Sequence, residues 1–252
     1  MGMNFGRFAR GFGPIMAIGL AATLAGCDGA KVTFDGEQGK PLEELDLSGA
    51  APTGVALLGP DTVRITRGDK LAIKVDGDPE AASAMRFTLK DGKLGILRKD
   101  GGWGRDKTVA VNVTLPALSE IAAMGSGSIS ADRIGGKASV SIGGSGSVET
   151  ATVEAESLDI SIAGSGSYRG AGQARALELS IAGSGSAEMD NLRVDSAEIS
   201  IAGSGNARFA SDGKVKASMV GSGEVRVKGR ATCTVSAVGS GKLVCENGVT
   251  DE

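Results

Sequence analysis

The sequence predicts an all-β fold: a right-handed parallel β-helix, or β-solenoid, with about 19 residues per coil and a strand-rich N-terminal cap. The tripeptide Gly-Ser-Gly starts seven times between residues 125 and 239, at steps of 19, 20, 19, 20, 18 and 18 residues. Between these tripeptides apolar and polar residues alternate, as in "LDISIAG" from Leu158 and "LELSIAG" from Leu177, which is typical of half-buried strands. Each unit is expected to contain about three short strands separated by bends. One unit cannot bury its apolar face alone, so the units are expected to stack with like strands paired in parallel.

Residues 1–26 have the pattern of a lipoprotein signal peptide. Arg7 and Arg10 precede an apolar run that is too short to span a bilayer comfortably and that ends in "LAGC" at Cys27. This tetrapeptide resembles a bacterial lipobox, which implies cleavage before Cys27 and acyl chains, palmitate among them, on that residue. Several chains on one residue anchor a protein stably where one chain is marginal. An ordinary signal peptide with an incidental cysteine is the alternative, and residues 27–43 are read as anchor and linker.

Residues 44–122 are strand-rich but lack the Gly-Ser-Gly repeat. The stretch "MRFTLKDGKLGILRK" alternates on both sides of Asp91-Gly92, a dipeptide typical of two-residue hairpin turns. "VRITRGDKLAIKV" alternates around a glycine-containing turn, and "TVAVNVTLPALSEI" alternates until Pro116. We therefore expect either atypical first coils or an antiparallel cap that protects the terminal strands of the stack.

Residues 123–247 form the repeat region, followed by a tail at 248–252. The glycines of each tripeptide are expected to turn the chain at a corner of the coil, where stacked neighbours leave no room for bulky side chains. The serine between them would form a column of short polar groups, pointing either inward or outward, with a structural role favoured over a ligand platform. The serines are Ser126, Ser145, Ser165, Ser184, Ser204, Ser222 and Ser240. The turn glycines are Gly125, Gly127, Gly144, Gly146, Gly164, Gly166, Gly183, Gly185, Gly203, Gly205, Gly221, Gly223, Gly239 and Gly241.

Two cysteines remain after Cys27, and both fall on inward positions of the last coil. Cys233 occupies the place that Leu177 and Ala197 hold in earlier repeats, and Cys245 the place of Met189 or Phe209. In an oxidising compartment a disulfide between them is expected, with two buried thiols as the alternative.

Composition excludes several classes of site. Lys and Arg total 27 against 30 Asp and Glu, which argues against a nucleic-acid partner. The chain has no histidine, which removes Ser-His-Asp catalysis and histidine metal sites. The glycine-rich stretches also miss known motifs: Leu243 stands where a phosphate-binding loop needs Ser or Thr, and Val148 stands where a calcium-binding repeat needs Asp. We expect no catalytic, cofactor-binding or metal-binding residues.

Acidic residues offer a catalytic alternative, because many parallel β-helices act on polysaccharides. Asp159, Glu178 and Glu198 occupy the same place in successive repeats and would line up in one row. Such a row of like charges is more often a solvated face than a catalytic site. Trp103 is the one conspicuous exposed aromatic candidate, either a loop anchor on the cap or a contact residue.

The lipobox, the stretch "VNVTLPALSEIAAMGSGSIS" and the repeated "SIAGSGS" together resemble the bacterial GIN head domain family, described as a "putative autotransporter adhesin head". The resemblance covers roughly residues 44–246. It implies a secreted or lipid-anchored, all-β, β-helical protein, and it carries over no catalytic residues.

The expected function is that of a non-enzymatic, lipid-anchored cell-envelope protein whose β-helix surface serves adhesion or interaction. A carbohydrate-active β-helix enzyme, lyase or hydrolase, and a purely structural envelope component are the alternatives. The expected partners are a membrane, through the N-terminal anchor, and envelope proteins or glycans. The expected location is the bacterial cell envelope, on the periplasmic or the surface side.

Overall fold

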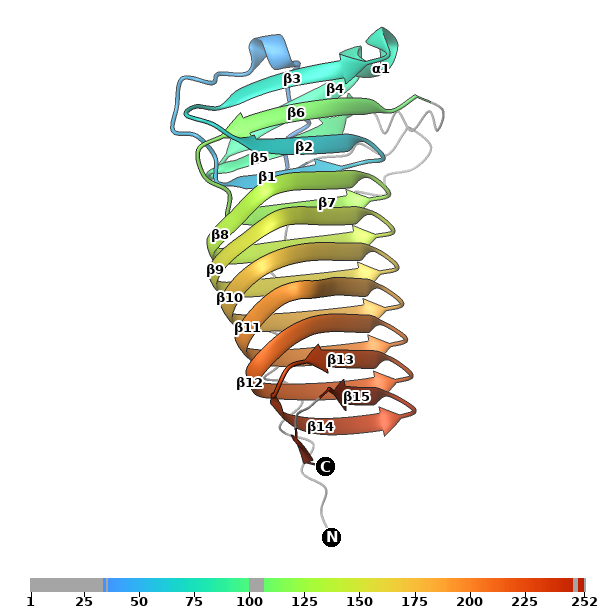
Figure 1. The fold of residues 1–252 in the computed structure, drawn as a ribbon. Coiled ribbons are helices and arrows are strands. Elements are labelled where there is room, and N and C mark those ends of the chain that lie inside the picture. Colours follow the sequence, from blue (N-terminus) through green and yellow to red (C-terminus); the bar gives the residue numbers. More distant parts are fainter. Residues whose placement is uncertain (1–33, 35, 100–106, 247–248, 252) are drawn as a thin grey trace.

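The computed structural model describes residues 34, 36–99, 107–246 and 249–251, and these wind into a stack of parallel coils (Figure 1). The expected all-β solenoid with about 19 residues per coil is confirmed, and the stack has about seven turns. The signal peptide, Cys27 and Trp103 lie outside the described residues. Within the described part of the chain, no helix is long and apolar enough to cross a membrane.

Each central coil is one long strand rather than three short ones. Neighbouring coils pair in parallel and in register, so that Leu158, Leu177 and Ala197 lie on top of one another. The strands bend where the register shifts, for example between Gly136 and Lys137, because an extra residue on one strand bends it without ending the ladder. The long strands are β8 (Ser128–Gly144), β9 (Ser147–Gly164), β10 (Ser167–Gly183), β11 (Ser186–Gly203) and β12 (Asn206–Gly221).

The last coils are built from shorter strands. β13 and β14 continue the two halves of β12, β15 pairs with β13, and β16 pairs with the start of β14. Their bounds are β13 (Glu224–Lys228), β14 (Thr232–Gly239), β15 (Lys242–Cys245) and β16 (Val249–Asp251).

The N-terminal part combines both structures expected for it. β1 pairs in parallel with β5 and β7, and β2 with β6 and β8, which makes these strands the first coils. β3 runs antiparallel to β6, and β4 antiparallel to β5 through the Asp91-Gly92 turn, where both residues have positive φ, so the expected hairpin is confirmed. The elements are η2 (Leu42–Glu44), β1 (Gly54–Leu58), β2 (Thr62–Arg67), β3 (Ala72–Gly77), α1 (Pro79–Ser83), β4 (Met85–Lys90), β5 (Lys93–Arg98), β6 (Val109–Leu115) and β7 (Glu120–Gly125).

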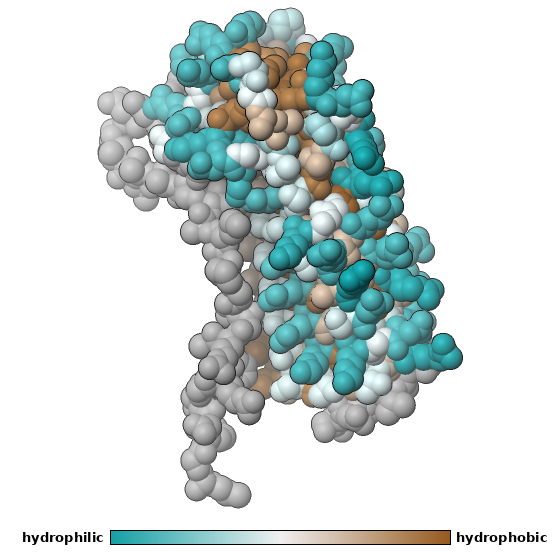
Figure 2. Space-filling model, turned by 90° about the vertical axis from the view of Figure 1, so that its left-hand side faces the viewer, coloured by the Kyte–Doolittle hydropathy of each residue, from teal (hydrophilic) through white to brown (hydrophobic). Residues whose placement is uncertain are grey.

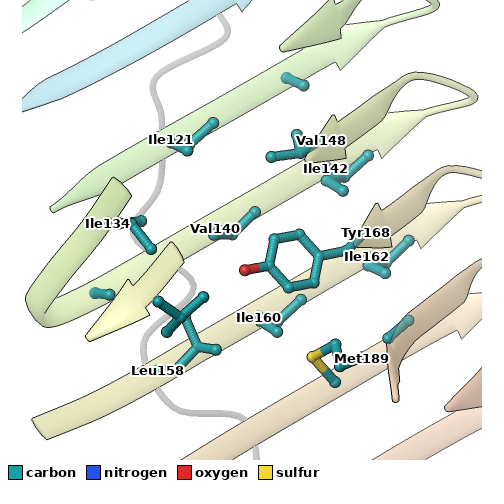
Figure 3. Packing of buried hydrophobic residues seen from close by; sticks show 14 of the residues in the cluster. Ile121, Ile134, Val140, Ile142, Val148, Leu158, Ile160, Ile162, Tyr168 and Met189 are labelled. Carbon is teal, nitrogen blue, oxygen red and sulfur yellow. The ribbon is translucent and has the colours of Figure 1, made fainter. Parts of the chain in front are cut away.

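The core runs along the inside of the stack. Alternation places one set of residues inward, and Ile121, Val140 and Ile160 follow one another down the coils, all fully buried (Figure 3). Full burial of such a side chain is worth about 1.5–3 kcal/mol relative to exposure. The ring of Tyr168 points into this interior, where its hydroxyl is hydrogen-bonded to that of Thr150 at 2.6 Å. Burial raises the pKa of Tyr168 to about 12.

The corners explain why each repeat needs two glycines. Gly183 has φ +119°, a conformation that side chains rarely adopt, and the amide of the next residue, Ser184, donates to the carbonyl of Gly164 one coil earlier at 2.9 Å. Gly185 needs no positive φ, but a Cβ there would lie 2.5 Å from Cγ2 of the buried Ile162. All seven corner serines are exposed, so the serine column points outward.

Candidate functional site

The three acidic residues singled out in the sequence lie side by side on the outside of the solenoid. Asp159 of β9 is in register with Glu178 of β10, which is in register with Glu198 of β11, and Lys216 of β12 continues the column. Adjacent strands are about 4.8 Å apart, so consecutive carboxylates are close neighbours. We call Asp159, Glu178 and Glu198 the acidic column.

The acidic column lines a depression of about 390 Å³. The lining begins directly after the register shifts at which the long strands bend, at Ser157 of β9 and Ser196 of β11. Figure 2 shows the side of the molecule at which the long strands bend in Figure 1, with hydrophilic side chains along the coils. Besides the acidic column, the lining residues are Ser157, Leu158, Ala176, Leu177, Ser196, Ala197, Lys214 and Lys216.

Crowding changes how the acidic column holds protons. Partial burial of the carboxyl group raises the pKa of Asp159, and the pKa of Glu178 is raised first by partial burial and then by the charges of Asp159 and Glu198 on the neighbouring strands. Carboxylates in this state accept a proton more readily than free ones, and their exposed oxygens can accept hydrogen bonds from a ligand's hydroxyl or amine groups. In the described ranges of the chain, no three acidic or cysteine side chains are grouped so as to hold a metal ion.

We expect Glu178→Gln to raise the melting temperature at pH 7, because it removes a charge that its neighbours repel. A carboxyl group with a raised pKa binds its proton more tightly in the folded chain, so the free energy of unfolding falls as pH rises through that pKa. The advantage of the glutamine should therefore shrink as pH falls from the raised pKa towards the ordinary carboxyl value of 4.5, and should be absent below it. Thermal melts followed by circular dichroism between pH 3 and 7 measure this.

Glu188→Gln is the matched control for this prediction. Glu188 lies on another outward column and accepts a hydrogen bond from Arg169 at 2.9 Å, so its loss removes an attraction rather than a repulsion. An equal gain at pH 7 in both variants would contradict the prediction.

The two cysteines that the sequence analysis placed in the last coil lie away from the acidic column. Cys233 and Cys245 are joined by a disulfide with a Cα–Cα distance of 6.8 Å, and they occupy the positions of Val215 and Val227 in the preceding coil. The bond connects β14 and β15 in the last coil, where fewer neighbouring strands supply contacts.

Sequence reasoning missed a buried ion pair at the cap. The guanidinium of Arg98 donates to both carboxylate oxygens of Asp61, at 2.8 and 2.5 Å, and both side chains are almost fully buried. Arg98 also donates to the carbonyl of Lys107, and the amide of Val109 donates to Asp61. This pairing raises the pKa of Arg98. The pair connects Arg98 at the end of β5 to Asp61 just before β2, and its backbone hydrogen bonds reach the start of β6, which makes it a structural clamp.

A family model described as "Putative auto-transporter adhesin, head GIN domain" matches residues 51–231. No curated protein matches the chain.

Several solved structures share the fold. A "putative adhesin" from Bacteroides fragilis is 18% identical with a TM-score of 0.65, and a "putative lipid binding protein" from Parabacteroides distasonis is 21% identical with a TM-score of 0.62. A "putative adhesin" from Parabacteroides merdae is 20% identical with a TM-score of 0.60. Each match covers 78% of this chain and 92–93% of the other chain. At these identities the likeness shows the fold alone.

Proposed function

The chain belongs to the family of adhesin head GIN domains, and from this premise we propose that it is a non-enzymatic adhesion or interaction module of the bacterial cell envelope. We propose further that acyl chains on Cys27 attach it to a membrane, as the lipobox-like sequence implies. The observation that carries the proposal is the continuous register from β8 to β14, which repeats each outward position from coil to coil. Such a surface is long, rigid and preorganised, as a contact surface requires.

The acidic column fits a contact surface better than a catalytic centre, because all three residues are exposed to solvent. A carbohydrate-active β-helix enzyme is the second candidate, because two features of the acidic column, its spacing and its raised pKa values, suit such an enzyme. The strand spacing of about 4.8 Å approaches the roughly 5–5.5 Å between the two carboxyl groups of retaining glycosidases, and a raised pKa suits a general acid.

The proposal is tested with the lipidated mature protein carried on vesicles. Vesicles bearing the protein should be retained on immobilised envelope fragments of its native bacterium at least tenfold more than protein-free vesicles. A Cys27→Ser variant should be recovered in the soluble fraction instead of with the membranes, which checks the anchor separately.

Two results would overturn the proposal. One is retention no greater than that of bare vesicles. The other is turnover of an envelope polysaccharide by the purified protein that Asp159→Asn, Glu178→Gln or Glu198→Gln abolishes, since this would favour the enzyme.

A further inference from the structure

One outer face of the solenoid is already covered at its cap end. Ala56, Leu58, Leu97 and Ala122 alternate with core residues and so face away from the core, yet each is at most 3% exposed. They form a separate apolar cluster with Phe34, which is itself 2% exposed. The start of the described chain therefore lies on the outside of the sheet made by β5, β1 and β7.

The outward residues of β5, β1 and β7 on which Phe34 packs form a surface that we call the seat, and small residues there make room for the ring. A Cβ at Gly95 of β5 would lie 2.8 Å from the ring of Phe34, so only glycine lets the ring rest there. Phe34 is fixed by two backbone hydrogen bonds with Glu37, both 2.9 Å. Thr88 of β4 pairs with Gly95, and within the described chain its buried hydroxyl has no hydrogen-bond partner. The seat thus keeps one unsatisfied polar atom beside Phe34.

The outward columns that contain Ala122 and Met124 continue over the next four coils, and there they consist of small residues only. Below Ala122 the first column continues with serine, and below Met124 the second continues with glycine and alanine. Side chains this short leave a low surface on which an extended chain can lie flat. The first column is Ser141, Ser161, Ser180 and Ser200, and the second is Gly143, Ala163, Ala182 and Ala202.

The sequence just before Phe34 matches such a surface. In "AKVTF" the apolar residues Ala30, Val32 and Phe34 alternate with Lys31 and Thr33. An extended segment with this pattern presents its apolar side chains to one face.

We propose that residues 28–33 run in extended form down this outer face from Phe34, with Val32 and Ala30 resting on the two small-residue columns. Six residues reach about 20 Å at roughly 3.3 Å each, which is the height of about four coils. This last step rests on the proposed function: with acyl chains on Cys27, the membrane anchor leaves the solenoid beside its middle coils.

Cysteine pairs test the docking in the lipidated mature chain. Ala30→Cys combined with Ser161→Cys should form a disulfide under mild oxidation at least tenfold faster than Ala30→Cys combined with Ser130→Cys. Ser130 is an exposed serine of β8 that belongs to the opposite broad face, in the ladder that leads to Glu149. Equal rates, or bonding to Ser130 alone, would overturn the proposal.

A second measurement needs no cross-link. Val32→Asp should speed protease cleavage between residues 27 and 34 several-fold, whereas Thr33→Asp, on the other side of an extended segment, should leave it unchanged. Equal cleavage of both variants would contradict the docking. Both experiments use purified protein in detergent, so a failure of envelope adhesion would leave their results unaffected.

Discussion

Gly183→Val is expected to lower the free energy of unfolding by more than about 4 kcal/mol and to prevent an ordered stack from forming at growth temperature. Two effects add at this position. The φ of +119° is strained for any branched side chain, and a Cβ would lie 2.5 Å from the carbonyl oxygen of Gly164. That oxygen already accepts the amide of Ser184 and belongs to the coil above, so it cannot move without breaking the ladder. Urea unfolding followed by circular dichroism gives the free energy.

Ala182→Val is the matched control, one residue away. Ala182 points outward in the column where the chain itself carries Val220 and Val238, both well exposed. Its substitution should change the free energy of unfolding by less than about 0.5 kcal/mol. If Gly183→Val were as mild as Ala182→Val, the close stacking of the corners would be wrong.

The solenoid could be predicted because repetition leaves the chain few alternatives. Once the "SIAGSGS" units recur at a near-constant step, in-register stacking is the arrangement that buries every apolar face, and Leu158, Leu177 and Ala197 were placed correctly on that basis. The alignment of Asp159, Glu178 and Glu198 follows from the same step. The number of strands per coil did not follow, because bulges such as that at Glu156, opposite Gly136, let a long strand bend while it stays paired.

The cap shows what periodicity misses. Alternation located β4 and β5, but nothing local indicates that Phe34 packs on the outside of the sheet or that Gly95 makes room for it. Asp61 and Arg98 are 37 residues apart and fall in patterns that look like ordinary surface charge. The Asp61–Arg98 pair forms only when the cap folds, so the sequence spacing of the two residues does not predict it.

Arg98→Ala is expected to cost about 3–5 kcal/mol of unfolding free energy, because it leaves the carboxylate of Asp61 buried without its counter-charge. Arg133→Ala provides the comparison. Arg133 donates to Glu154 at 2.6 Å, a similar distance, but both side chains are more than 40% exposed. Water and ions screen that pair, so its loss should cost no more than about 1 kcal/mol. Denaturant unfolding of the two variants in one buffer measures the difference.

The double variant Asp61→Leu/Arg98→Met separates charge burial from packing. If the cost of Arg98→Ala comes from an isolated buried charge, removing both charges with apolar residues of similar size should recover at least half of it. The amide of Val109 and the carbonyl of Lys107 would each lose a partner, so complete recovery is not expected. A double variant as unstable as Arg98→Ala would mean that the hydrogen bonds to the β6 backbone, rather than the charge pair, hold the cap closed.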